Sequence, residues 1–155
     1  MQNEGATNVS KVQALADSVV LTFFFLLQVG EYHTPSGNRK TRTITQIRRK
    51  DLQFWCRRPS LLLDRLFSLS MLAILQADSV TITLDNQKNG QRDTVLHHEA
   101  LPNNPLCPCK AAARRFVTMR LANPTDPNTI LSLYTLHKHI LATQMACILK
   151  KPSAP

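Results

Sequence analysis

The chain has 155 residues, 43% of them hydrophobic, which suits one domain with a buried core. Its 19 Lys and Arg residues outnumber 10 Asp and Glu residues, so the net charge of +9 favours an anionic partner such as nucleic acid. The apolar run at residues 19–27 would span only about 14 Å as a helix, which is too short to cross a bilayer.

The N-terminal part of the chain predicts a tail followed by a buried helix. Residues 1–9 are polar, and we expect them to form a flexible tail. From Val12 to Leu27 apolar residues recur at helical spacing and cover most of the helix circumference. This helix should therefore be central, with Gly30 at its C-terminal end.

A basic segment follows at residues 39–58. Within it, residues 43–55 have the composition of a strand, and we expect a bulge near Arg49. The segment carries +7 of the net +9. A solvated loop is one interpretation, and a nucleic-acid contact surface is the other. Its basic residues are Arg39, Lys40, Arg42, Arg48, Arg49, Lys50, Arg57 and Arg58.

The middle of the chain predicts a helix and a hairpin. Residues 61–76 have a helical pattern, and residues 80–84 alternate as a strand does. Asn89 and Gly90 form the favoured two-residue turn, and residues 93–97 return as the partner strand.

Residues 105–122 predict an amphipathic helix that ends at the Pro-containing loop 123–127. Its apolar side comprises Cys109, Ala112, Ala113, Phe116 and Met119, and the basic residues Lys110, Arg114, Arg115 and Arg120 lie elsewhere. Residues 130–141 fit either a helix or a strand, and Thr143 could cap a last helix. The predicted class is α+β, mainly helical, with a small antiparallel sheet of about three strands.

Four segments occur in an order that resembles the first half of the tyrosine recombinase (phage integrase-like) catalytic domain. They are FFFLLQVGEY (23–32), IRRKDLQF (47–54), VTITLDNQKNGQRDTVLH (80–97) and PLCPCKAAARRF (105–116). The residue sequences of these segments are most similar to those of recombinase-like proteins of eukaryotic mobile elements. The resemblance implies a partial catalytic domain over residues 10–151, with flexible tails at 1–9 and 152–155.

The resemblance also implies a set of functional residues. In that family an Arg at the end of the buried helix binds the scissile phosphate, but Gln28 occupies this position here. Glu31 matches the acidic residue that helps to hold it, and Lys88 matches the hairpin Lys that acts as a general acid. An amide lacks the fixed charge and bidentate donors of a guanidinium, so we expect severely reduced catalysis.

The later catalytic motifs of the family are not found in this sequence. No Arg follows Arg120, so neither His137 nor His139 can begin an HxxR box, and Tyr134 is interpreted as a packed aromatic residue. The chain is therefore expected to be inactive alone, as a truncated or decayed recombinase that needs no metal or nucleotide.

The partner implied by the resemblance is double-stranded DNA, with a homo-oligomer on DNA as an open arrangement. The expected phosphate contacts, which position the protein rather than specify a sequence, are Arg39, Lys40, Arg42, Arg48, Arg49 and Lys50.

Two alternatives remain open. The chain could be a noncatalytic basic module that binds a protein or RNA, and zinc could stabilise it through His97, His98, Cys107 and Cys109. The CxC and HH spacings favour structural cysteines over zinc ligands. Four cysteines without a signal peptide indicate a reducing intracellular compartment, which in a eukaryote would be the nucleus.

Overall fold

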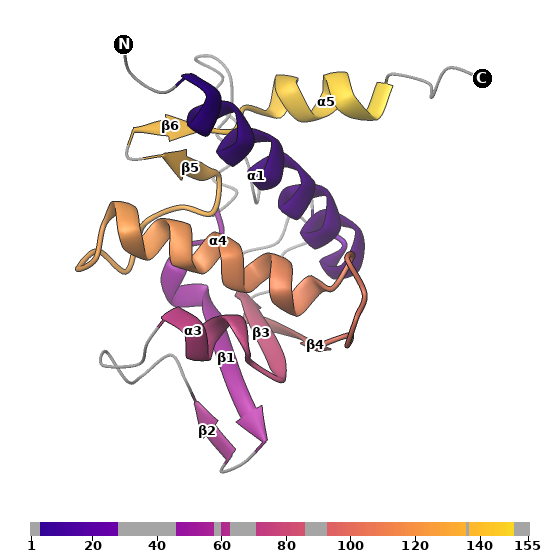
Figure 1. Ribbon diagram of the computed structural model, residues 1–155. Coiled ribbons are helices and arrows are strands. Elements are labelled where there is room, and N and C mark those ends of the chain that lie inside the picture. Colours follow the sequence, from indigo (N-terminus) through magenta and orange to yellow (C-terminus); the bar gives the residue numbers. More distant parts are fainter. Residues whose placement is uncertain are drawn as a thin grey trace.

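The computed structural model describes residues 4–27, 46–57, 60–62, 71–85, 93–135 and 137–150 (Figure 1). The helical elements are α1 (Glu4–Phe25), the 3-10 turn η1 (Arg49–Asp51), α3 (Met71–Leu75), α4 (Pro108–Ala122) and α5 (Ala142–Lys150). The strands are β1 (Leu52–Arg57), β2 (Ser60–Leu62), β3 (Ser79–Leu84), β4 (Thr94–Glu99), β5 (Leu133–Thr135) and β6 (Lys138–His139). The predicted α+β class, with more helix than strand, is confirmed.

The larger sheet is antiparallel and has the strand order β2-β1-β3-β4. Strands β1, β3 and β4 have six residues each and form the small sheet that the sequence predicts, while the three-residue β2 extends its edge. The β3–β4 pairing runs from Ser79 opposite Glu99 to Leu84 opposite Thr94. Both hairpin strands are thus confirmed, and the predicted turn at Asn89 and Gly90 lies outside the described residues.

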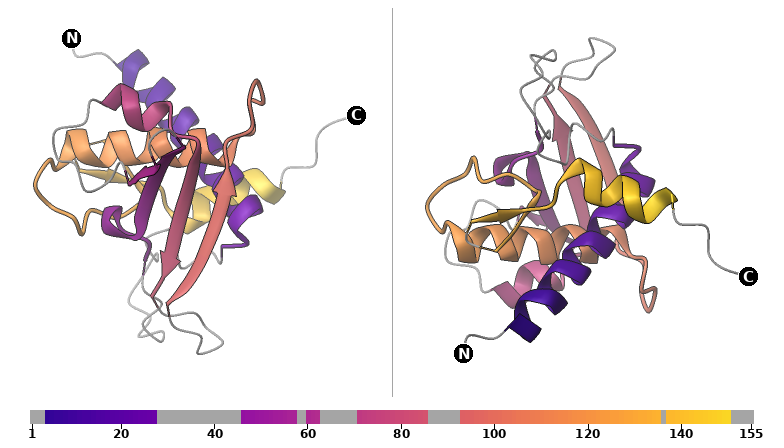
Figure 2. Two further views of the ribbon diagram at one scale, coloured as in Figure 1. Left: turned by 90° about the horizontal axis from the view of Figure 1, so that it is seen from below. Right: turned by 90° about the horizontal axis from the view of Figure 1, so that it is seen from above.

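Helix α4 packs on one face of this sheet, and α1 packs against α4 and reaches β4 at its C-terminal end (Figures 1 and 2). On β1 and β3 the inward side chains Leu52, Phe54, Val80 and Ile82 are fully buried. Phe54 meets Phe116 of α4 edge to face, with ring centroids 5.3 Å apart. Three consecutive buried alanines, Ala111, Ala112 and Ala113, let α4 approach its neighbours closely.

Helix α1 differs from its prediction at both ends. It begins at Glu4, so most of the tail expected at residues 1–9 is helical. It ends at Phe25 because Leu26 adopts a left-handed conformation with φ of 51°, and the Leu27 N–H then donates to the Thr22 carbonyl at 3.2 Å. The expected end at Gly30 lies outside the described residues, and the helix stops earlier by this Schellman-type closure.

Two further expectations for the middle of the chain are corrected. The irregularity near Arg49 is the η1 turn that precedes β1, rather than a bulge within a longer strand. Of the helix predicted at 61–76, residues 71–75 form α3, whereas Leu61 and Leu62 belong to β2 and pair with β1. A short apolar run such as LLL fits a strand as well as a helix, and pairing with β1 decided between them.

The ambiguous stretch at 130–141 contains the β5–β6 hairpin, and α5 follows it. Thr143 does not cap α5 because the helix already begins at Ala142. Instead, the Leu141 N–H donates to Oε1 of Gln144 at 3.1 Å, which is half of a capping box. No helix in the described ranges has the length and apolar composition of a membrane span.

Candidate nucleic-acid interface

The described part of the basic segment is fixed by its backbone to the loop that follows α4. The Arg49 N–H donates to the Thr129 carbonyl at 2.8 Å, and the Lys50 N–H donates to the Pro127 carbonyl at 2.9 Å. These two bonds join chain segments that are far apart in sequence. The positions of the three basic residues 48–50 are therefore set by α4 and its following loop as well as by β1.

The Asp51 side chain stabilises the η1 turn by a hydrogen bond to the backbone of the same turn. Its Oδ2 accepts a hydrogen bond from the Arg48 backbone N–H at 2.8 Å. Desolvation raises the pKa of the Asp51 carboxyl, and it outweighs the opposing effects of this hydrogen bond and of the nearby Lys50 and Arg48 charges. The turn thus has its own internal acceptor, and the Arg48 and Lys50 side chains are not needed to form it.

Arg49 lies in the interior, contrary to the expectation that it contacts phosphate. Its side chain is only 7% exposed, and Nη1 donates to the carbonyl of Asn123 at 2.6 Å. Asn123 is the C-cap of α4, where carbonyl groups lack partners within the helix and a cation is favoured. We therefore assign Arg49 to the packing of α4 and remove it from the set of DNA contacts.

Arg48 and Lys50, on either side of Arg49, retain access to solvent. Lys50 is exposed, and Arg48 is half-buried with Nη1 3.2 Å from Oδ1 of Asn128, an exposed residue. A bond to an exposed amide competes with water and is easily exchanged for a bond to phosphate. These two side chains are the described cations of the segment that could meet DNA.

The remaining predicted site residues lie outside the described residues. They are Gln28, Glu31 and Lys88 of the recombinase-like set, and Arg39, Lys40 and Arg42 of the basic segment. The roles expected for them stay predictions.

The end of α1 that precedes Gln28 is nevertheless described, and it is held by β4. Nε2 of His98 donates to the Phe24 carbonyl at 2.8 Å, and the His98 ring lies edge to face against Phe25 with centroids 4.6 Å apart. This contact gives His98 a packing role that the sequence interpretation missed.

The alternative of a zinc site is not supported by the positions of the two histidines. His97 and His98 are adjacent in β4, so their side chains point to opposite faces of the sheet. His98 contacts α1, whereas Nδ1 of His97 lies 3.3 Å from Oγ1 of Thr81 on the outer face. Among the described residues, no three His, Cys, Asp or Glu side chains are grouped as a metal site requires.

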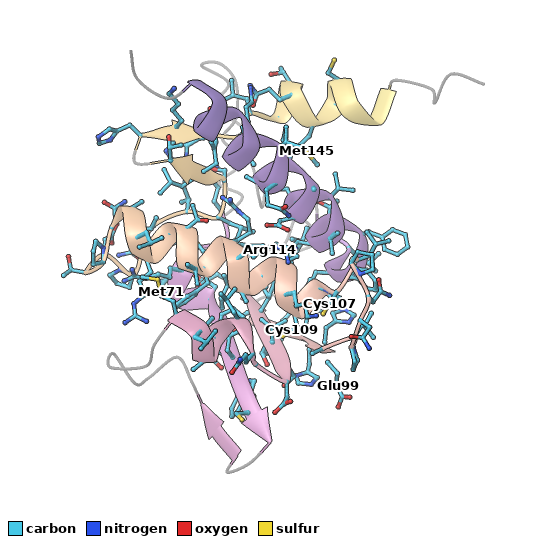
Figure 3. All side chains as sticks on the ribbon, viewed as in Figure 1. Met71, Glu99, Cys107, Cys109, Arg114 and Met145 are labelled. Carbon is cyan, nitrogen blue, oxygen red and sulfur yellow. The ribbon has the colours of Figure 1, made fainter. Side chains whose placement is uncertain are left out.

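The two cysteines of this alternative are structural in character. Sγ of Cys107 accepts the Leu101 N–H at 3.2 Å, and Sγ of Cys109 lies 3.4 Å from the Ala77 carbonyl. Burial, with a smaller contribution from Cys107, raises the pKa of the Cys109 thiol to about 12, so it is protonated at neutral pH. Both lie near the start of α4 in Figure 3, as expected for residues that pack this end of the helix.

Two further basic residues of α4 point inward, which the sequence interpretation missed. The Arg114 guanidinium binds the Asp17 carboxylate between α4 and α1, and Asp17 is 2% exposed (Figure 3). The buried Arg115 donates through Nη2 to the carbonyls of Leu131 and Leu133. Asp17 is the only charged residue between Val12 and Leu27, and this was the available signal, because a buried carboxylate needs a cationic partner.

Comparison of the chain with family models, with curated proteins and with solved structures finds no match.

Proposed function

We propose that this protein binds duplex DNA through the basic segment at residues 39–58, as a remnant of a tyrosine recombinase. The observation that carries the proposal is the exposed Lys50 beside the half-buried Arg48 on a turn whose backbone is fixed to the loop after α4. The resemblance of the four sequence segments supports the family, and the described strands and α4 occur in the expected order.

Contacts of this kind act on the sugar-phosphate backbone. Lys and Arg side chains neutralise phosphates and release counterions, which gives affinity with little dependence on base sequence. The side chains of Arg39, Lys40 and Arg42 would extend the same surface if they meet the DNA with Arg48 and Lys50. The expected complex is therefore salt-sensitive and unspecific in sequence.

Strand cleavage is not part of the proposal. The position of the family's phosphate-binding Arg is Gln28, which carries no charge to stabilise a pentacoordinate phosphate. Tyr134 is half-buried and packs against the hydrophobic core, so it has the character of a packed aromatic residue rather than of a nucleophile.

The test is a fluorescence-anisotropy titration of the full chain with a labelled DNA duplex over a range of salt concentrations. The double variant Arg48→Ala/Lys50→Ala should bind more weakly, and the slope of log K against log salt should become shallower by about 2. Lys110→Ala is the matched control. Lys110 is an exposed lysine near the start of α4, at the end of the helix away from Arg48 and Lys50, so this substitution should leave the slope unchanged.

Two results would overturn the proposal. Affinity that stays constant between low and high salt would exclude phosphate contacts as the main source of binding. Equal competition by RNA and by duplex DNA would instead favour a noncatalytic basic module with a different partner.

A further inference from the structure

A cavity of about 270 Å³ opens between α1, α3 and α4. Its walls include the apolar side chains of Ala14 on α1, Leu75 on α3 and Val117 on α4. Leu75 keeps 38% of its surface exposed, so it is in contact with solvent as well as with the cavity. The cavity is therefore open to solvent along an apolar wall.

Exposed leucines continue this apolar surface toward the C-terminal half of α4, where α3 lies beside that helix (Figures 1 and 2). Leu72 is 60% exposed and precedes Leu75 by three residues, so the two lie on the same side of α3. Leu121 is 62% exposed and follows the cavity-lining Thr118 by three residues. We call the cavity together with Leu72, Leu75 and Leu121 the apolar groove. Exposed apolar surface that is contiguous in this way is typical of a protein-binding site.

The helices around the apolar groove carry an excess of positive charge. Over residues 11–25, 71–75 and 108–122 the sequence has one acidic residue, Asp17. Asp17 is 2% exposed and its carboxylate accepts hydrogen bonds from Arg114, so it presents almost no negative charge to solvent. The basic residues of the same ranges are Lys11, Lys110, Arg114, Arg115 and Arg120.

Arg114 combines a fixed position with an accessible charge. Its Nε and Nη2 atoms are held by Asp17, yet 34% of its side-chain surface is exposed, and it lines the cavity (Figure 3). Lys110 is exposed and precedes Arg114 by four residues, so it lies on the same side of α4. One side of α4 thus presents two cations in its first half and apolar side chains in its second half.

We propose that the apolar groove binds an acidic amphipathic helix of a protein partner. An apolar side chain of that helix occupies the cavity, and a carboxylate lies beside Arg114 and Lys110. The stretch of α4 from Lys110 to Leu121 is about 16 Å long, which matches three turns of a bound helix with apolar residues at i, i+3 and i+7.

Charge and surface chemistry favour this occupant over two others. A second copy of the chain would bring its own net charge of +9 and the same cationic helices, which would repel each other. Duplex DNA would satisfy the cations, but its sugar-phosphate backbone is polar and would leave the leucines without an apolar partner.

The test is a fluorescence-anisotropy titration of the full chain with a labelled helical peptide that has leucine on one face and glutamate on the other. This peptide should bind saturably, and a peptide with lysine in place of every glutamate should bind much more weakly. A glutamate peptide that does not saturate, or a lysine peptide of equal affinity, would overturn the proposal.

Variants of the exposed leucines locate the site. Leu75→Asp should weaken the binding of the glutamate peptide by about tenfold or more, because it places a negative charge in the apolar wall. Leu121→Asp should act in the same direction and is a second test should Leu75→Asp fail to fold. Val12→Asp is the matched control, since Val12 is 66% exposed on α1 and does not line the cavity. Equal loss in Val12→Asp, or no loss in either leucine variant, would contradict the site.

Two further measurements test the other occupants and the other site. Sedimentation velocity of the chain alone should show a monomer, and self-association that Leu121→Asp abolishes would assign the groove to a second copy instead. The double variant Arg48→Ala/Lys50→Ala should keep its affinity for the glutamate peptide, because η1 does not line the cavity. Loss of peptide binding in that variant would place the peptide on the basic segment and refute the groove.

Discussion

Two groups of basic side chains lie near α4, and they differ in whether the protein interior or the solvent surrounds them. Arg49, Arg114 and Arg115 point into the protein, where carbonyl groups and Asp17 receive their hydrogen bonds. Arg48 and Lys50 remain in contact with solvent, although they are the immediate neighbours of Arg49. The number of basic residues in a sequence segment therefore does not give the number of positive charges at the protein surface.

The difference follows from the acceptors that each side chain can reach. A buried guanidinium needs several oxygens at fixed positions, and the end of α4 and the β5 region supply carbonyls to Arg49 and Arg115. Lys50 is exposed, so water can solvate its ammonium group without fixed protein acceptors. Substitutions within the two groups should therefore separate stability from DNA affinity.

The largest expected effect on the interior group comes from Arg114→Met. It leaves the buried Asp17 carboxylate without its cationic partner, and we expect the free energy of unfolding at pH 7 to fall by about 3 kcal/mol. Urea denaturation measures the change, and Lys110→Met on the exposed part of the same helix is the control. Adding Asp17→Asn should recover part of the loss, since it removes the uncompensated charge. A loss below about 1 kcal/mol would mean that the pair behaves as a surface ion pair.

Substitutions of the adjacent residues Arg49 and Lys50 test the difference between the interior and the surface group most directly. Arg49→Ala should lower the free energy of unfolding by about 2 kcal/mol, because it removes a buried hydrogen bond and the packing of the side chain. Lys50→Ala should change stability by no more than about 0.5 kcal/mol and should weaken DNA binding. Denaturation and DNA titration of both variants are needed. Equal loss of DNA affinity in folded Arg49→Ala protein would place Arg49 with the surface group.

The smallest expected effect is a pH dependence centred on His139. Nδ1 of His139 lies 3.1 Å from Oγ of Ser132, within the β5–β6 region that supplies the carbonyls for Arg115. Burial lowers the pKa of His139 below its ordinary 6.5. Just below pH 6.5, His139 is therefore protonated more often in the unfolded chain than in the folded protein, and this favours unfolding. The contribution of His139 is therefore complete above pH 6.5 and is lost as the pH falls through the lower folded-state pKa.

Urea denaturation between pH 7 and pH 5.5 should show this loss in the natural chain. His139→Gln should flatten the dependence. His137→Gln is the matched control because His137 is an exposed histidine of the same hairpin region, and it should leave the dependence unchanged. A dependence that His139→Gln does not alter would assign the effect to other groups.

Much of the helix and strand content could be predicted because it depends on local periodicity. The apolar side expected for α4, including Cys109, Phe116 and Met119, is buried throughout, and the alternation at 80–84 identified β3 correctly. The failures have a common cause. The apolar run at 61–62 became part of β2 through pairing with β1, and the η1 turn depends on bonds to the loop at 127–129.

The candidate site could be predicted only in part for the same reason. Composition and order in the sequence determined the basic segment and the α+β class. Which basic side chains stay at the surface was decided by tertiary structure, because the acceptors for Arg49 and Arg115 belong to segments distant in sequence. A guanidinium is buried only where such oxygens converge on it, and no local pattern of residues reports that convergence.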